Sequence, residues 1–443
     1  MRIKLLSLVV CLATLEILVV PVARQAPPAQ AASRPNVVIF MSDDQRFDML
    51  TAQFMPNVYD RLIVGNPYAF TNSFVPNPLC CPSRTSTLTG NYSHTTGVWY
   101  NNGPYGGFGA FDDRHTIARD FDRAGYRTAM IGKYLNGYRG GHDSYIPPGW
   151  DRWFATNTGA FYDYGVTTNK KLLQFGSRPK DYIGRVLDTQ AVGFVNSAVA
   201  ANDPFFLFYS FTAPHHPSTP DPRDIGRFTG VDAGPPDTNE KMLASAYSVD
   251  RAVGHLMDVL PPNTIIVYMS DNGYLWRESK GTWGELVAKQ WPYDESIRVP
   301  IIISGTTLTA GVNDIVLNVD LRKTLTRAAG VSPLTRSDGI NLGSDTYASR
   351  TVFPLEHYQE RESGQRSRIP TYCGAREANT MYVRYRVLEA DGTFKKYLEE
   401  LYVDANNDET TNVAADPLYS LDLQRMRQAA VALCDPTPPH YHW

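Results

Sequence analysis

Four apolar segments of this chain each end in polar side chains that can bind an ion or transfer a proton. The four endings, in chain order, are Asp43 with Asp44, Lys133, His215 with His216, and Asp271 with Asn272. Carboxylate and amide oxygens are the ligands that calcium and magnesium prefer, whereas zinc sites usually contain histidine or cysteine. The acidic endings therefore predict a calcium or magnesium site and argue against a two-zinc phosphatase site.

Two adjacent thiols provide a second kind of chemistry. Cys80 and Cys81 lie in the stretch NPLCCPSRTSTLTG, residues 77–90. Pro82 suits the first position of a helix, so Cys80 is expected at the amino end of a short helix, where backbone dipoles favour negative charge. Neighbouring cysteines do not easily bridge each other, because the ring that they would close strains the backbone. We therefore expect this pair to serve a purpose other than a disulfide.

The elements that must position these side chains are the apolar segments themselves: NVVIFMSDD, RTAMIGKY, FFLFYSFTAPHH and TIIVYMSDNG. Apolar runs without alternation are typical of strands buried on both faces. Before the second strand, Ile117, Phe121 and Ala124 predict a helix that Thr116 caps and Gly125 ends. This order predicts a mostly parallel sheet covered by helices, with ligands beyond the carboxyl ends of the strands. All four polar endings are then expected at one edge.

The amino terminus indicates export. A basic start precedes the apolar run Leu5–Val22, and the small-residue pattern APPAQA follows up to Ala31. This pattern predicts a signal peptide over residues 1–31, a secreted or otherwise extracytoplasmic protein, and no stable membrane insertion after signal removal. In such an oxidising compartment we expect one disulfide, between Cys373 and Cys434.

The length of 443 residues exceeds the usual size of a single core, so two domains are expected. A catalytic domain is predicted over residues 32–345 and a smaller α+β subdomain over residues 346–443. In the second, TVFPLEHY, TMYVRYRVL and FKKYLEELYV alternate apolar and polar residues, which is typical of a one-sided antiparallel sheet. A final helix is predicted after Pro417. The residues expected on its buried face are Leu423, Met426, Ala430 and Leu433.

The segment CCPSRTSTLTG resembles the signature of the type I sulfatase family, Cys-x-Pro-Ser-Arg followed by Leu-Thr-Gly. Further matches, in order, are GKYLNGY, IPPGW, TAPHHP, SDNGY, PYDESIRVPIII, ELYVD and TTNVAADP. They extend from Asn36 to about Pro417, and their spelling is nearest to the N-acetylglucosamine-6-sulfatase and heparan sulfatase branch. The resemblance implies an alkaline-phosphatase-like α/β fold, with a large, mostly parallel mixed sheet between helices and a smaller C-terminal domain built on an antiparallel sheet.

The resemblance also implies a nucleophile and a metal. Cys80 matches the cysteine that a formylglycine-generating enzyme oxidises to formylglycine, an aldehyde whose hydrate attacks sulfur and then releases sulfate. Calcium, with magnesium as the alternative, is the implied cofactor. Its implied ligands are Asp43, Asp44, residue 80 derived from Cys80, Asp271 and Asn272.

Cationic and imidazole side chains complete the implied site. Arg84 is expected to favour the ionised nucleophile, and Lys133 with Lys289 to bind the sulfate oxygens. His215, in preference to His216, is expected to protonate the leaving oxygen, because imidazole titrates near neutral pH. The catalytic set implied by the resemblance is thus Cys80, Arg84, Lys133, His215 and Lys289.

The chain departs from the family pattern in two places. Leu275 follows DNGY where many relatives have histidine, which makes the segment Trp276–Lys289 unusual, and Leu135 replaces a histidine of other sulfatases. Aromatic residues could stack on sugar rings or merely pack in the core. These residues are Tyr138, Tyr145, Trp150, Trp276, Trp283 and Trp291.

The expected substrate is a sulfated sugar, such as 6-O-sulfated N-acetylglucosamine, or an aryl sulfate. Two alternatives remain: a phosphoric or phosphonic monoester hydrolase with the same site, and an inactive secreted sulfoglycan-binding protein that keeps Cys80 as a thiol. A net charge of −3 without a basic excess argues against nucleic acid as a partner.

Overall fold

The computed structural model describes most of the chain after the predicted signal peptide. The described residues are 34–138, 145–156, 159–169, 171–231, 236–359, 361–362, 365–366, 369–403 and 409–443. The predicted signal peptide, residues 1–31, lies outside them. Residues Arg34–Trp443 pack as one unit, and the predicted domain boundary near residue 345 stays a prediction. No helix among the described residues is long and apolar enough to cross a membrane.

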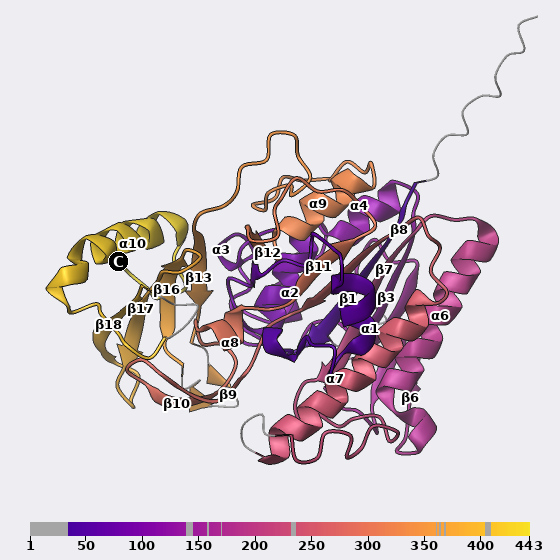
Figure 1. Ribbon diagram of the computed structural model, residues 1–443, viewed down its shortest axis with the longest axis horizontal. Coiled ribbons are helices and arrows are strands. Elements are labelled where there is room, and N and C mark those ends of the chain that lie inside the picture. The colour runs from indigo at the N-terminus through magenta and orange to yellow at the C-terminus, as the bar shows by residue number, and fades with distance from the viewer. Residues whose placement is uncertain are drawn as a thin grey trace, which may run out of the picture. The chain divides into compact units, whose positions relative to one another are not determined.

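An eight-stranded sheet forms the centre of the fold (Figure 1). Its strands, in order across the sheet, are β11 (Ile301–Ser304), β8 (Thr264–Ser270), β1 (Asn36–Asp43), β7 (Phe205–Pro214), β3 (Arg127–Lys133), β4 (Arg152–Thr156), β5 (Gly165–Thr168) and β6 (Leu172–Gln174). Neighbours from β8 to β4 are parallel. At the edges, β11 is antiparallel to β8, and β5 is antiparallel to both β4 and β6. The predicted mixed, mostly parallel sheet is confirmed.

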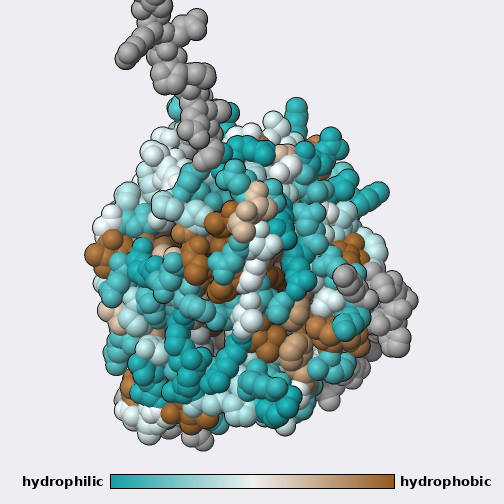
Figure 2. Space-filling view, turned by 90° about the vertical axis from the view of Figure 1, so that its right-hand side faces the viewer, coloured by the Kyte–Doolittle hydropathy of each residue, from teal (hydrophilic) through white to brown (hydrophobic). Residues whose placement is uncertain are grey.

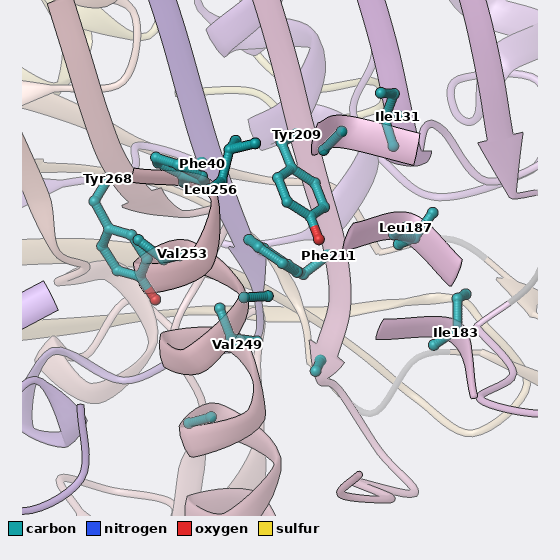
Figure 3. Packing of buried hydrophobic residues seen from close by; sticks show 14 of the residues in the cluster. Phe40, Ile131, Ile183, Leu187, Tyr209, Phe211, Val249, Val253, Leu256 and Tyr268 are labelled. Carbon is teal, nitrogen blue, oxygen red and sulfur yellow. The ribbon is translucent and has the colours of Figure 1, made fainter. Parts of the chain in front are cut away.

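Helices cover both faces of this sheet, because its central strands alternate apolar side chains between two buried sides. Val38 and Phe40 of β1 face one cluster, in which α6 (Ile183–Ala201) and α7 (Pro236–Met257) take part (Figure 3). Val37 and Ile39 face the other, with helices α2 (Cys80–Thr89), α4 (Ile117–Arg123) and α9 (Asp320–Ala328).

The other described helices are α1 (Pro56–Val58), α3 (Ser93–Thr96), α8 (Asp294–Ile297) and α10 (Ser420–Leu433). Short 3-10 or π turns lie at Phe47–Met49, Tyr59–Ile63, Phe108–Ala110, Pro179–Asp181 and Pro417–Tyr419.

Two predicted helix starts differ from the structure in detail. Helix α2 begins at Cys80, so Pro82 is its third residue and not its first. A proline is tolerated there because the first N–H groups of a helix have no partner within the helix. Thr116 does precede α4, but its side chain makes no capping hydrogen bond. The predicted position of Cys80 at the amino end of α2 is confirmed.

A separate four-stranded antiparallel sheet lies near the carboxyl terminus. Its order is β13 (Phe353–His357), β16 (Thr371–Arg376), β17 (Met381–Leu388) and β18 (Phe394–Tyr402). The prediction of a one-sided sheet is wrong for β13 and β16, whose residues are all buried. Helix α10 covers one face through Met426 and Ala430, while Leu275 and Trp291 pack on the other. The predicted disulfide is confirmed, with a Cα–Cα distance of 6.3 Å between Cys373 and Cys434.

Three two-stranded ribbons complete the fold. Their strands are β2 (Asn72–Phe74) with β12 (Ile315–Leu317), β9 (Leu275–Lys280) with β10 (Gly284–Ala288), and β14 (Arg361–Glu362) with β15 (Gln365–Arg366). The β9–β10 hairpin corresponds to the segment in which the chain departs from the family pattern, and it ends one residue before Lys289.

Candidate active site

The carboxyl ends of the parallel strands bring the predicted polar endings to one edge of the sheet. Asp43 ends β1, Lys133 ends β3, and His215 and Asp271 directly follow β7 and β8. Gly132, before Lys133, allows β3 to approach β7 closely, since a Cβ atom there would lie 1.7 Å from the carbonyl oxygen of Ser210. This approach positions Lys133 at the edge of the sheet.

The thiol of Cys80 lies at the centre of this edge and is 1% exposed. Its Sγ atom is 2.8 Å from Nζ of Lys289, 3.6 Å from Nζ of Lys133 and 3.8 Å from Oδ1 of Asp43. Burial raises the pKa of the Cys80 thiol, although both lysines act in the opposite direction. An unmodified thiol is therefore a poor nucleophile in this environment, because the thiolate is the reactive form.

Arg84 lies one helical turn after Cys80 and joins three elements. Its Nε donates to Oδ2 of Asp271 at 2.7 Å, and its Nη1 donates to the carbonyl of Lys133 at 2.9 Å and to Oγ of Ser210 at 2.7 Å. Burial would lower the pKa of Arg84, but Asp271 and Asp43 raise it, so the guanidinium stays charged. Arg84 therefore fixes α2 against β3, β7 and the end of β8.

The acidic and amide side chains form a group of oxygen atoms suited to a hard cation. The backbone N–H groups of Asp44 and Asn272 donate to Oδ1 of Asp271 at 3.1 Å and 2.8 Å. Nδ2 of Asn272 donates to Oδ1 of Asp44 at 2.7 Å. The buried Oδ1 of Asn272 accepts no hydrogen bond from any residue that the structure describes. An unpartnered amide oxygen beside carboxylates fits calcium or magnesium.

Two buried lysines neutralise these carboxylates. Lys133 forms an ion pair with Asp43, and Nζ of Lys289 lies 2.6 Å from Oδ1 of Asp44. Burial would raise the pKa of both aspartates, but these lysines, assisted by His215, lower it. The carboxylates therefore stay ionised, and the paired lysines stay protonated because Asp43 and Asp44 raise the pKa of Lys133 and Lys289 against the effect of burial.

His215 faces the group of carboxylates, whereas His216 is exposed. Nδ1 of His215 lies 2.6 Å from the carbonyl oxygen of His216, and Nε2 lies 3.7 Å from Oδ2 of Asp44. A proton on Nδ1 satisfies that carbonyl and directs Nε2 toward the site. Burial lowers the pKa of His215, and the attraction of Asp44 only partly offsets this effect.

The structure adds residues that sequence reasoning missed. Asn101 accepts the backbone N–H of Cys81 at 2.8 Å, and Ser210 accepts from Arg84. No motif quoted for the family includes Asn101, and nothing in the apolar strand that contains Ser210 distinguishes its hydroxyl from those of Tyr209 and Thr212. The backbone N–H of Asn136 donates to Sγ of Cys81 at 3.1 Å, which gives the second thiol a structural contact.

Most of the aromatic candidates pack in the core. Tyr138, Trp150, Trp276 and Trp291 are buried in hydrophobic clusters, whereas Tyr145 is 46% exposed. Leu275 and Leu135, which replace histidines of relatives, are also buried. Trp283 is partly buried against one of these clusters, so Tyr145 and Trp283 are the aromatic candidates that keep exposed surface for sugar stacking.

Comparisons with known proteins agree with this arrangement. The sulfatase family profile matches residues 35–331. The chain is 33% identical over 353 residues to a putative extracellular sulfatase Sulf-1 homolog of Caenorhabditis elegans, with 70% of this chain and 49% of that protein covered. It is 29% identical over 364 residues to the N-acetylglucosamine-6-sulfatase of Homo sapiens, with 71% of this chain and 64% of that protein covered. The chain thus spans between about half and two thirds of these relatives.

Solved structures share the fold. A structure in complex with its substrate D-glucosamine-2-N,6-O-disulfate superposes with a TM-score of 0.74 at 21% identity, over 92% of this chain and 100% of that chain. A phosphonate monoester hydrolase of Agrobacterium radiobacter gives 0.68 at 19% identity, over 91% of this chain and 96% of that chain. The expected alkaline-phosphatase-like sulfatase fold is therefore confirmed.

Proposed function

This chain belongs to the sulfatase family, and we propose that it is a sulfuric ester hydrolase acting on sulfated sugars or aryl sulfates. One observation carries this proposal: the side chain of residue 80 lies between the ammonium groups of Lys289 and Lys133 and beside the carboxylate of Asp43. A nucleophile flanked by two cations can attack an anionic ester while the charge that builds up on its oxygens is neutralised.

We further propose that Cys80 is converted to formylglycine by a formylglycine-generating enzyme. The high pKa of the buried thiol supports this step, because an unmodified Cys80 would be protonated at neutral pH. A hydrated aldehyde supplies one hydroxyl to attack sulfur and a second that allows sulfate to leave. Arg84 and the amino end of α2 would favour the ionised form of that hydroxyl.

Calcium is the cofactor that the donor set supports best. Asp43, Asp44, Asp271 and the free Oδ1 of Asn272 would hold it, together with the side chain derived from Cys80. Ligand atoms of Asp43, Asp44, Cys80 and His215 lie within 4.8 Å of one another. When bound, a divalent cation lowers the pKa of a neighbouring hydroxyl and neutralises anionic oxygens. The carboxylates are already ionised through Lys133 and Lys289, so no proton has to leave them before a cation binds.

Proton transfer to the leaving oxygen is assigned to His215. Its Nδ1 faces a backbone carbonyl, so Nε2 is the atom free to carry and release a proton. Lys133 and Lys289 would bind the sulfate oxygens and hold the ester in line with residue 80. The proton of His215 would pass to the leaving alkoxide, so that the sugar or phenol departs as an alcohol.

The names of the relatives support a sulfated amino sugar as substrate and an extracytoplasmic location. Extracellular sulfatases and N-acetylglucosamine-6-sulfatases are both among them. A 6-O-sulfated N-acetylglucosamine is accordingly the proposed sugar, and the predicted signal peptide supports export.

A phosphonic or phosphoric monoester hydrolase is the second candidate, because phosphonate monoester hydrolases share this fold. Turnover of the sulfate and phosphate esters of one phenol separates the two reactions. We expect a higher kcat/KM for the sulfate ester. Faster cleavage of the phosphate ester would contradict the sulfatase proposal, and a protein that keeps Cys80 as a thiol and turns over neither ester would favour a sulfoglycan-binding protein.

A further inference from the structure

A basic groove lies along the edge of the central sheet, away from the residues of the candidate active site. It has a volume of about 690 Å³ and runs between α6 and the strands β4, β5 and β6. The face that carries α6 and β6 is turned to the viewer in Figure 2, where hydrophilic residues predominate and apolar residues form scattered patches. The groove is lined by Arg152, Phe154, Thr168, Asn169, Lys171, Leu173, Phe175, Lys180, Arg185, Val186, Thr189 and Gln190.

The charge of this lining has one sign. Among the residues that the structure describes, it contains four cationic side chains, those of Arg152, Lys171, Lys180 and Arg185, and no carboxylate. The chain as a whole carries a net charge of −3, so the positive charge of the groove is local and opposite in sign to the net charge of the protein. Lining of this kind attracts anions and raises their local concentration.

Three of these cations are available for a ligand. Lys171 and Lys180 are exposed and form no ion pair with any residue that the structure describes. Arg152 donates to the neutral amide of Gln190 at 2.6 Å, which leaves its charge uncompensated. Arg185 is different, because it pairs with Asp221 at 2.7 Å.

Acidic residues on the neighbouring elements are already engaged. Asp181 binds Arg178 at 3.0 Å, and Asp188 lies 2.8 Å from Nδ1 of His255. Neither acid lines the groove. Asp181 lies close enough to Lys180 for their charges to interact, but it already pairs with Arg178, and neither Lys171 nor Lys180 forms an ion pair with a described residue.

The floor of the groove is apolar and aromatic. Phe175 and Leu173 are partly exposed in the lining, and Phe175 packs edge to face on the buried Phe154 with ring centroids 6.4 Å apart. Carbohydrate rings present C–H groups that pack on such surfaces while their charged substituents reach cations at the rim. Cations above an apolar floor match a sulfated sugar better than a small inorganic anion.

The helix that lines the groove, α6, passes beside the strand that ends at Lys133. Leu187, two residues after Arg185, lies against Gly132, because a Cβ atom on that glycine would be 3.4 Å from Cδ1 of Leu187. At the other end, Arg152 pairs with Ala129, four residues before Lys133 in β3. At about 3.3 Å per residue, the groove therefore extends roughly 13 Å from the edge of the sheet that holds Lys133.

From these observations we propose that the groove is a second binding site for a sulfated polysaccharide chain. The scissile sulfate lies at Cys80 while a further part of the same polymer binds Lys171, Lys180 and Arg152. This inference rests on the proposed sulfatase function and narrows its substrate to polymers. A small aryl sulfate reaches only the candidate active site and gains nothing from the groove.

The test is a double charge reversal, Lys171→Glu with Lys180→Glu. The matched control is Lys395→Glu with Lys396→Glu, which makes the same charge change on the exposed end of β18. Retention on immobilised heparin, measured as the salt concentration needed for elution, reports binding without any need for turnover. We expect the groove variant to elute at lower salt than the wild type and the control variant. Similar elution of both variants would overturn the proposal.

Turnover provides the second measurement. The groove variant should raise KM for desulfation of heparin about tenfold and leave kcat/KM for 4-nitrophenyl sulfate unchanged. Equal effects on both substrates would contradict a separate polymer site. If the wild type cleaves neither substrate, the sulfatase proposal fails, whereas the retention experiment still decides the groove. Competition by single-stranded DNA as strong as that by heparin would overturn the assignment to sulfated sugar.

Discussion

Nζ of Lys289 lies 2.8 Å from Sγ of Cys80, although these two residues belong to distant parts of the chain. Lys289 directly follows the β9–β10 hairpin. Its two neighbours in the chain, Ala288 and Gln290, have φ angles of 84° and 81°. Such angles are strained for residues other than glycine, and they persist only where the surroundings enforce them. Here the N–H of Gln290 donates to Pro78 and its carbonyl accepts from Tyr372. The C-terminal sheet thus helps to position Lys289.

Replacing Lys289 should test its contact with residue 80. We expect Lys289→Ala to lower kcat by about 10²- to 10³-fold, because an anion-stabilising group is lost from a buried site. Steady-state kinetics with an aryl sulfate measures this loss, and circular dichroism checks the fold. The exposed Lys241→Ala variant is the control and should keep wild-type kinetics. A Lys289→Ala enzyme with unchanged kcat would rule out this role for the lysine.

The two adjacent cysteines should differ sharply in their response to serine. A Cys80→Ser protein has a hydroxyl that can accept sulfate but has no second hydroxyl to release it, so intact mass after incubation with substrate should increase by one SO3 group. Cys81→Ser should remain active, because serine can accept the N–H of Asn136 in place of sulfur, at a stability cost of about 1 kcal/mol. Comparable loss of turnover in both variants, with no trapped sulfate, would contradict the assignment.

Calcium should stabilise the folded protein through the free oxygen of Asn272. At about 100 times its dissociation constant, a ligand that binds only the native state adds ~2.7 kcal/mol, so thermal unfolding should shift upward with calcium and downward with a chelator. The Asn272→Ala variant should show a smaller shift, since one of the oxygen ligands is gone. A wild-type melting temperature that is insensitive to both calcium and chelator would argue against a metal at these residues.

His357 should make the free energy of unfolding fall in acid. Burial lowers the pKa of this histidine to about 3, whereas an unfolded chain has a histidine pKa of about 6.5. Between these two pKa values the unfolded state binds a proton at His357 that the folded state does not bind. The contribution of neutral His357 to the free energy of unfolding is therefore complete above pH ~6.5 and is lost as the pH falls toward 3. Urea unfolding measures the free energy of unfolding at each pH. Near pH 5 the slope of this free energy against pH should be smaller in the His357→Gln variant than in the wild type by ~1.4 kcal/mol per pH unit.

His94 provides the control for that experiment. Burial would lower its pKa, but its hydrogen bond and ion pair with Glu356 raise it. The contribution of His94 to the free energy of unfolding is therefore present below pH ~6.5 and is lost as the pH rises through the pKa of the folded state. This pH dependence is opposite in sign to that of His357. The His94→Gln variant should keep the acid-side slope of the wild type. If His357→Gln also keeps that slope, the histidine is not buried in its neutral form.

Much of the fold could be predicted from local patterns. The unbroken apolar runs ending at Asp43, Lys133 and His215 required buried parallel strands, and strand direction alone then placed their endings at one edge. The burial of both faces of the C-terminal sheet could not be predicted, and the alternating pattern of its strands wrongly indicated one exposed face. Its second face is buried by Leu275 and Trp291, whose contacts depend on tertiary packing.

The site was predictable to the extent that its residues end strands or belong to a motif. Lys289 was identified by its spacing before PYDESIRVP, but its strained backbone and its contact with Asp44 follow from the hairpin. Asn101 lies in a loop that no pattern distinguishes. The basic groove was also missed, because Arg152, Lys171 and Lys180 are separated in sequence and meet only through the edge strands and α6.

The central claim is that Cys80 becomes the nucleophile of a sulfatase, and peptide mass spectrometry tests it most directly. The protein should be produced with a formylglycine-generating enzyme and digested, and the peptide that contains residues 80 and 84 should be measured. We expect the mass of an aldehyde in place of the thiol at residue 80, with residue 81 unchanged. A peptide that carries two intact cysteines, from protein that still hydrolyses sulfate esters, would contradict this account.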